Sequence, residues 1–229
     1  VGAPDDMARE AAERAQEGYQ RLQLKVGGRP LEVDIEAAHR VQEAVGPGVR
    51  LVLDANRGLT PADAVTLSQA LRDKALILEQ PCNTLRELAQ ARPRLCHPLY
   101  MDESAVDLAT MVSAAGQGLV EGFGLKLTRM GGLEPMAAAR DICRAAGLRH
   151  TCDDSWGGDI VAAACVQVAA SVAPEQLDGV WIAQPHIEGH YDAENGIRAE
   201  EGRIKLPSGP GLGLSIDPEQ FGPPVAAYD

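Results

Sequence analysis

Three carboxylates mark the ends of short apolar runs in this sequence. Asp54, Glu79 and Asp102 each follow directly on three apolar residues, and the two intervals between them are nearly equal. This rhythm is typical of repeated units of one strand and one helix. Parallel neighbouring strands lie about 4.8 Å apart, so their ends bring such side chains together at one edge of the sheet. Three carboxylates placed in this way can bind one hard divalent cation.

Two lysines flank these carboxylates along the chain, Lys25 before them and Lys126 after them, and both also stand at ends of predicted strands. A metal ion bound to a substrate carboxylate stabilises the negative charge that builds up when the neighbouring proton is removed. A lysine can take that proton if burial and the nearby cation lower its pKa towards neutrality. Two opposed lysines allow inversion of the carbon. One lysine acting with expulsion of a β-hydroxyl gives dehydration.

The rest of the chain supplies the elements that hold these groups. We expect seven strands separated by helices, with the chain beginning on a helix. The expected strands are 21–26, 149–152 and 180–183, and four that contain or lead into Asp54, Glu79, Asp102 and Lys126. The expected helices are 5–20 with Asp5 or Asp6 as its cap, 31–45, one capped by Thr60, 85–92, 107–116, 134–146 and 160–172.

The pattern favours a closed barrel over an open doubly wound sheet, because no glycine-rich phosphate-binding turn follows the first strand. If strand 21–26 is the second of eight, the strands of Lys25 and Lys126 are opposed. The two lysines then face each other across the barrel mouth.

Composition excludes several classes of partner. The formal net charge of −12 argues against nucleic acid and anionic membranes. The five cysteines form no C-x-x-C pair and are expected to be reduced and mostly buried, as in a cytoplasmic protein. His186 and His190 are four residues apart, but they stand in a tail that contains Pro and Gly, which does not favour a zinc site.

The motifs around these residues resemble the barrel domain of the enolase superfamily, in the subgroup of mandelate racemase and muconate lactonizing enzyme. The matching segments are Leu24-Lys25-Val26-Gly27, Asp54-Ala55-Asn56, Leu78-Glu79-Gln80-Pro81, Asp102-Glu103-Ser104 and Gly124-Leu125-Lys126. The resemblance implies an α/β fold, a modified TIM-type (β/α)7β barrel. It also implies one Mg²⁺ per active site held by Asp54, Glu79 and Asp102, with Lys25 and Lys126 as acid/base catalysts.

The same resemblance sets expectations for domains and assembly. It implies a barrel domain over residues 1–190 and a tail over 191–229 that packs towards an N-terminal α+β capping domain. We expect this chain to lack that capping domain and the first barrel strand. A homo-oligomer and a small-molecule carboxylate substrate are further implications, with neither nucleic acid nor membrane as a partner.

A narrower likeness concerns the segment from Thr151 to Asp159, which resembles the branch acting on proline derivatives, including hydroxyproline betaine and proline betaine epimerases. Asp153, Asp154 and Trp156 would then bind a cationic ring nitrogen, by ion pairing and by cation–π contact. The predicted function is a Mg²⁺-dependent racemase or epimerase that acts through a metal-stabilised enolate. The alternatives are a cis-3-hydroxy-L-proline dehydratase using the same lysines and a truncated, non-catalytic barrel.

Other interpretations of these residues remain open. The two lysines could be ion-pair partners of the acids, and the pair Asp153-Asp154 could cap the turn that follows it. Gln23 stands where the family commonly has a further lysine, which alters the charge near the metal or the substrate. Asn56 and Glu103 are expected to support the site or cap a helix rather than catalyse.

Overall fold

The computed structural model describes residues 2–226. Its helices are α1 (Pro4–Gln16), α2 (Leu31–Val45), α3 (Pro61–Ala70), α4 (Leu85–Ala91), α5 (Leu108–Gly116), α6 (Leu127–Met130), α7 (Leu133–Ala146) and α8 (Gly158–Ala169), with 3-10 helices η1 (Arg92–Arg94), η2 (Gln184–His186) and η3 (Pro218–Phe221). Its strands are β1 (Arg21–Lys25), β2 (Arg50–Asp54), β3 (Leu76–Glu79), β4 (Leu99–Met101), β5 (Gly122–Lys126), β6 (Arg149–Asp153), β7 (Leu177–Gly179), β8 (Ala199–Glu200) and β9 (Arg203–Ile204).

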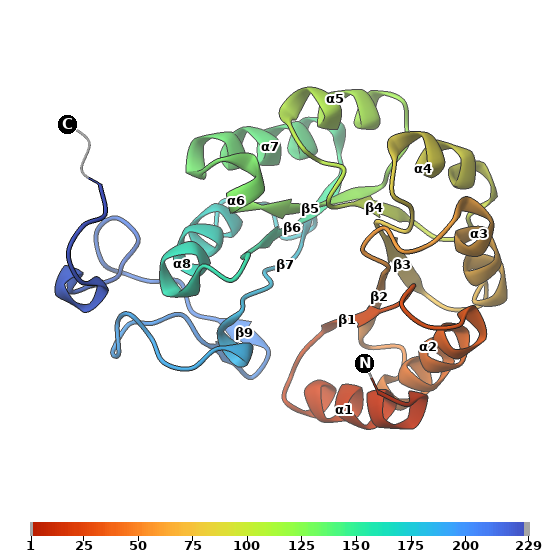
Figure 1. The fold of residues 1–229 in the computed structure, drawn as a ribbon, viewed down its shortest axis with the longest axis horizontal. Coiled ribbons are helices and arrows are strands. Elements are labelled where there is room, and N and C mark those ends of the chain that lie inside the picture. Colours follow the sequence, from red (N-terminus) through yellow and green to blue (C-terminus); the bar gives the residue numbers. More distant parts are fainter. Residues whose placement is uncertain (1, 227–229) are drawn as a thin grey trace.

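Seven parallel strands form a nearly closed barrel in the order of the chain, from β1 to β7. Figure 1 shows the strands curving around a central axis with the helices on the outside. The apolar runs form parallel strands because helices cover their outer face and the barrel interior encloses the inner one. The predicted α/β barrel is therefore confirmed.

Alternation along the strands decides which side chains enter the barrel. In β2, Leu51 and Leu53 pack outwards in the main core beneath the helices, whereas Val52 belongs to a separate inner cluster with Ile77 and Tyr100. Successive side chains of a strand point to opposite faces. Asp54 therefore shares the inner face with Val52, and the same count places Glu79 and Asp102 inside.

The floor of the barrel is polar. The buried carboxylate of Asp178 accepts hydrogen bonds from Arg50, from Arg149 and from the hydroxyl of Tyr100. Burial, and then the bond to Asp178, raises the pKa of Tyr100. Side chains from β2, β4, β6 and β7 thus meet in one charged network beneath the acidic strand ends.

The last strand of the barrel differs from its prediction. We expected it at 180–183, but it lies at Leu177–Gly179. The apolar run after it does not join the sheet, because carboxylates take its amide groups: Trp181 N donates to Asp153 Oδ1 and Ala183 N to Asp154 Oδ2. A backbone amide that is already bonded to a side chain is not free to pair with a strand.

Several helix ends also differ from prediction. The first helix begins at Pro4 with Ala3 as its cap, so Asp5 and Asp6 lie in its first turn, where acids favour the helix dipole. It ends at Gln16, and α8 spans Gly158–Ala169 rather than 160–172. The short helix α6 after Lys126 was not predicted. Thr60 caps α3 as expected.

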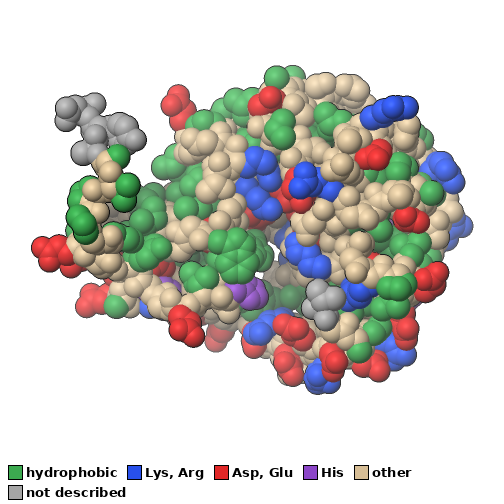
Figure 2. All heavy atoms as spheres, in the orientation of Figure 1, with side chains coloured by type: hydrophobic (Ala, Val, Ile, Leu, Met, Phe, Trp, Pro, Cys, Tyr) green, Lys and Arg blue, Asp and Glu red, His purple; other side chains and the backbone are tan. Residues whose placement is uncertain are grey.

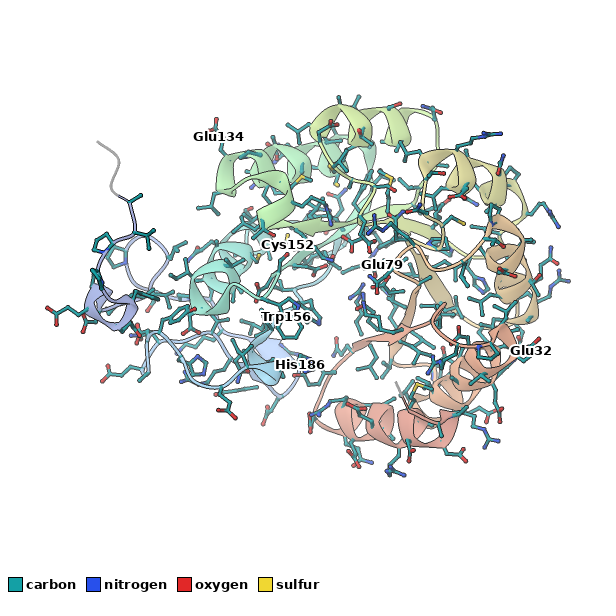
Figure 3. The ribbon with its side chains drawn as sticks, viewed as in Figure 1. Glu32, Glu79, Glu134, Cys152, Trp156 and His186 are labelled. Atoms are coloured by element: carbon teal, nitrogen blue, oxygen red, sulfur yellow. The ribbon has the colours of Figure 1, made fainter. Side chains whose placement is uncertain are left out.

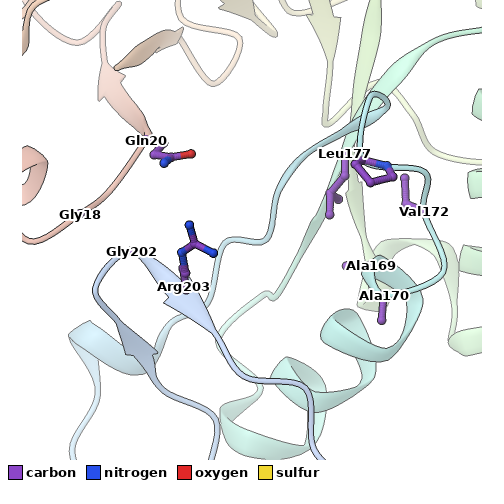
Figure 4. A pocket seen from close by; sticks show the side chains of 9 residues that line it. Gly18, Gln20, Ala169, Ala170, Val172, Leu177, Gly202 and Arg203 are labelled. Carbon is purple, nitrogen blue, oxygen red and sulfur yellow. The ribbon is translucent and has the colours of Figure 1, made fainter. Parts of the chain in front are cut away.

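The tail crosses the gap between β1 and β7, which are not paired within residues 2–226. The hairpin of β8 and β9 meets the turn before β1 so closely that a Cβ built on Gly202 would overlap the carbonyl of Gly18. A cavity of about 570 Å³ lies there, between Gln20 and Arg203 on one side and Leu177 on the other (Figure 4). Residues 227–229 of the predicted tail lie outside the described residues.

Within residues 2–226, no helix combines the length and the apolar character that crossing a membrane requires.

Candidate active site

The three predicted carboxylates lie inside the barrel at the neighbouring ends of β2, β3 and β4. Asp54 and Glu79 are register partners, and each is at most 2% exposed. Gly124 on β5 leaves the space in which Glu79 and Asp102 approach each other. A Cβ on that glycine would lie 3.1 Å from Glu79 Oε1 and 3.4 Å from Asp102 Cγ. The structure therefore places the three residues that the sequence singled out at neighbouring strand ends inside the barrel.

Both predicted lysines contact this acidic group, from opposite sides. Lys25 Nζ on β1 lies 2.5 Å from Asp54 Oδ2, and Lys126 Nζ on β5 lies 2.7 Å from Asp102 Oδ2. The lysine side chains are 53% and 29% exposed, so both reach the solvent-facing end of the barrel. The ion pairs that the sequence left open as an alternative are thus present, and they engage two of the three carboxylates proposed as metal ligands.

The chemistry of the donors fits a divalent metal ion. All three side chains offer only oxygen, the ligand that Mg²⁺ prefers. Asp102 Oδ1 is buried without a well-oriented hydrogen-bond donor, although the Arg129 guanidinium lies 2.6 Å away. Within residues 2–226, no three His, Cys, Asp or Glu side chains already converge as a formed metal centre. Asp54 and Asp102 instead turn oxygens towards their lysines.

Glu79 is the central carboxylate of the three along the sheet. Gln23 donates to its Oε2 at 2.9 Å, and a guanidinium nitrogen of Arg21 lies 3.4 Å from the same atom. Burial raises the pKa of Glu79 to about 7, and the charge of Arg21 offsets this only in part. The neighbouring carboxylates of Asp54, Asp153 and Asp102 raise it further. An excess of negative charge around Glu79 is the arrangement that a cation would relieve.

This perturbation predicts a pH-dependent metal affinity. We expect Mg²⁺ to bind about tenfold more weakly at pH 6 than at pH 8, because Glu79 must lose its proton to become a ligand and its pKa is about 7. Calorimetric titrations in two buffers of different ionisation enthalpy would count the protons released. Because of Glu79, about one more proton should leave on binding at pH 6 than at pH 8. Equal affinities with no additional proton release at pH 6 would contradict the assignment of Glu79.

The pKa of Lys126 differs from expectation. Burial alone would lower it, but the charge of Asp102 and the hydrogen bond to that carboxylate outweigh burial and raise the pKa above its ordinary value. The pKa of Lys126 thus shifts in the opposite direction to the one expected from burial and a nearby cation together. The ion pair with Asp102, which the sequence left open as an alternative, decides the direction of this shift.

The residues expected to support the site connect neighbouring loops. Asn56 Nδ2 donates to Glu103 Oε1 at 3.1 Å, which joins the loop after β2 to the loop after β4. The backbone amide of Asn56 also donates to Asp54 Oδ1 at 2.9 Å. Together with Gln23, these residues contact the carboxylates or their loops, and their supporting role stays a prediction.

Asp153 and Asp154 lie at the end of β6 and are both buried. Asp154 Oδ1 accepts from the amide of Gly157 at 2.9 Å, which is the turn-capping contact that the sequence left open. Asp153 Oδ2 accepts from the Thr151 hydroxyl at 2.6 Å, and burial raises its pKa. Asp154 therefore fixes the turn that carries Trp156, whereas Asp153 bonds Thr151 on its own strand and the backbone of Trp181. Direct contact of either carboxylate with a substrate stays a prediction.

Trp156 is 62% exposed and is held in a left-handed conformation with φ of 68°. Its ring lies 5.6 Å from that of Trp181 and 5.9 Å from that of His186. Figure 3 shows Trp156 and Glu79 on opposite sides of the central opening, and Figure 2 shows Lys and Arg side chains gathered around a hollow in the same face. Sequence reasoning did not place Trp181 beside Trp156, and it considered His186 only as a zinc ligand. The signal was available, because the chain has only two tryptophans.

Comparison with known proteins adds an independent finding. A family model described as "Enolase C-terminal domain-like" matches residues 6–220. The chain is 34% identical to a cis-3-hydroxy-L-proline dehydratase of Roseibium aggregatum over 99% of its length and 61% of the relative's. It is 33% identical to a hydrophobic dipeptide epimerase of Enterococcus faecalis, over 65% of this chain and 42% of that protein.

A solved structure shares the whole fold. An enolase superfamily member from Roseovarius nubinhibens ISM, complexed with magnesium, superimposes with a TM-score of 0.94 at 32% identity. The match covers 100% of this chain and 62% of that one. The chain thus spans about three fifths of the length of this structure and of the Roseibium aggregatum dehydratase.

Proposed function

The chain belongs to the enolase superfamily, in its enolase C-terminal domain-like family, and from this membership we propose an activity. This activity is the Mg²⁺-dependent racemisation or epimerisation of proline-type amino acids or betaines. The placement of the two lysines carries this proposal. Lys25 on β1 and Lys126 on β5 stand on either side of the three strands that end in Asp54, Glu79 and Asp102. Groups on opposite sides of a bound substrate can remove a proton from one face and return one to the other.

The three carboxylates would hold the metal ion, which supplies a Lewis acid for the substrate carboxylate. Each lysine donates a hydrogen bond to one of these carboxylates. A metal ion bound by the carboxylates would compete for the oxygens that stabilise the ammonium form of the lysine. A neutral lysine can then accept the α-proton, while the opposite lysine, still protonated, donates one. Arg129 stays close to Asp102 and can keep that loop in place while the lysine changes partner.

The substrate class is proposed from the rim of the barrel. A cationic ring nitrogen is attracted to the face of an indole within about 6 Å of its centre. The exposed ring of Trp156 and its neighbour Trp181 offer such faces beside the opening. The buried acids Asp153 and Asp154 add negative charge below them. These features support a proline-type amine or betaine.

Isotope exchange tests the proposal. With saturating Mg²⁺ in D₂O, we expect deuterium to enter the α-carbon of both stereoisomers of a proline betaine or proline, because each lysine exchanges its proton with solvent. Proton nuclear magnetic resonance follows the loss of the α-proton signal, and metal-free protein with chelator serves as the control. Absence of exchange for the whole series of proline derivatives would overturn the proposed substrate class.

A dehydratase is the second candidate, and the similarity to the Roseibium aggregatum dehydratase favours it. The same lysines would remove the α-proton of cis-3-hydroxy-L-proline and deliver a proton to the departing hydroxyl group, which leaves as water. Formation of a ketimine or keto product from that substrate, without inversion of unhydroxylated proline, would select this reaction over epimerisation. If the chain binds no Mg²⁺ and neither reaction occurs, the acids are structural and the barrel is non-catalytic.

A further inference from the structure

Gln80 directly follows the central carboxylate Glu79, and its side chain is fully buried. Its amide nitrogen donates to Ser104 Oγ at 2.7 Å and to the carbonyl of Cys82 at 3.0 Å. Its amide oxygen accepts from the backbone amides of Asp102 at 3.0 Å and of Ser104 at 3.1 Å. Both donors and both acceptor positions of the carboxamide are therefore in use.

The backbone of Gln80 makes equally long-range connections. Its amide donates to the carbonyl of Tyr100 at 2.9 Å, and its carbonyl accepts from the amide of Arg57 at 2.8 Å. Arg57 belongs to the loop that follows Asp54, and Tyr100 belongs to the strand that leads into Asp102. Gln80 thus bonds the backbone of a residue that follows each of the three acids: Arg57 after Asp54, Cys82 after Glu79 and Ser104 after Asp102.

The backbone conformation of Gln80 is unfavourable for its residue type. Its φ is 37°, in the left-handed region that residues with a Cβ seldom adopt. Such conformations persist where the surrounding contacts over-determine them, and they concentrate at functional sites. Here the four side-chain bonds supply that constraint, and two of them end on the amides of the segment that carries Asp102.

We propose that Gln80 is a positioning residue, which fixes the spacing of Asp54, Glu79 and Asp102 so that they can close on one metal ion. This inference rests on the proposed function, because it assigns Gln80 a purpose in metal binding. The role requires a side chain that both donates and accepts. A glutamate of equal length would turn an acceptor towards the carbonyl of Cys82, and a methionine would leave the buried amides of Asp102 and Ser104 without a partner.

Calorimetric titration with Mg²⁺ tests this role, with thermal unfolding measured in parallel on each protein. We expect Gln80→Met to raise the Kd for Mg²⁺ by about 10- to 100-fold, the usual effect of removing a group that orients a ligand. Ser104→Ala removes one acceptor and leaves residue 80 intact, so it should raise the Kd in the same direction by a smaller factor. This milder variant keeps the test possible if Gln80→Met does not fold.

Gln176→Met is the matched control. Gln176 also donates its amide to two backbone carbonyls, those of Cys143 and Leu148, but at the opposite end of the sheet. This variant should lower thermal stability and leave the Kd for Mg²⁺ unchanged. An unchanged Kd in Gln80→Met and Ser104→Ala, or an equal increase in Gln176→Met, would overturn the positioning role alone. Failure of the unaltered protein to bind Mg²⁺ would overturn the proposed function, and the positioning role with it.

Discussion

Replacing Lys126 by methionine is expected to lower the turnover number for epimerisation by about a thousandfold, and Lys25→Met should do the same, because each change removes one acid/base group. Neither change should unfold the site. Asp102 keeps the Arg129 guanidinium at 2.6 Å when Lys126 is removed, and Asp54 keeps the backbone amide of Asn56 at 2.9 Å when Lys25 is removed.

The variants Lys25→Met and Lys126→Met should also separate the proton exchange of the two stereoisomers. Because the remaining lysine faces only one side of the substrate, each variant should exchange the α-proton of one stereoisomer in D₂O and leave the other nearly unchanged. Lys205→Met, at an exposed position in the tail, is the control and should behave like the unaltered protein. Full turnover in both single variants would mean that the lysines are ion-pair partners only.

Replacing Asp178 by asparagine is expected to cause the largest loss of stability. The change leaves Arg50 and Arg149 without their shared anion in the floor of the barrel. Removing one partner of a buried ion pair costs about 3–5 kcal/mol. These arginines are 41% and 37% exposed, so solvent reduces the expected loss to about 2–3 kcal/mol.

Thermal unfolding in metal-free buffer with chelator measures this effect. A loss of that size lowers the Tm of a chain of this length by about 5–10 °C. Asp107→Asn is the matched control, since it makes the same change of charge at an exposed helix cap that asparagine also serves. Equal Tm values for the two variants would show that the Asp178 network contributes little.

The sequence was sufficient to predict the barrel and to select Asp54, Glu79 and Asp102, because two simple regularities coincide there. Apolar runs recur at a nearly constant interval, and alternation along each strand turns the terminal acid inwards. Helix boundaries near clear signals were also predictable, as the Thr60 cap shows. Local chemistry decides these features, so it is visible in a few consecutive residues.

The remaining features depend on contacts between distant segments. The run 180–183 has the composition of a strand, but the carboxylates of Asp153 and Asp154 compete for its amides, and this cannot be read locally. The pKa of Lys126 depends likewise on which acid it bonds. Gln80 stood in a motif that resembles the family, but its contacts could not be predicted, because its partners Asp102 and Ser104 lie on another loop.

The contact between Gly18 and Gly202 also bears on how the chain folds. Each barrel strand pairs with the next strand along the sequence, so the ring can grow by steps of small sequence separation, which favours rapid folding. The meeting of the two glycines joins opposite ends of the chain and must overcome the entropy of closing a very long loop. The parallel strands of the barrel are therefore expected to pair before the contact between Gly18 and Gly202 forms. This contact should be the first part of the fold to open when hydrogen exchange is followed under native conditions.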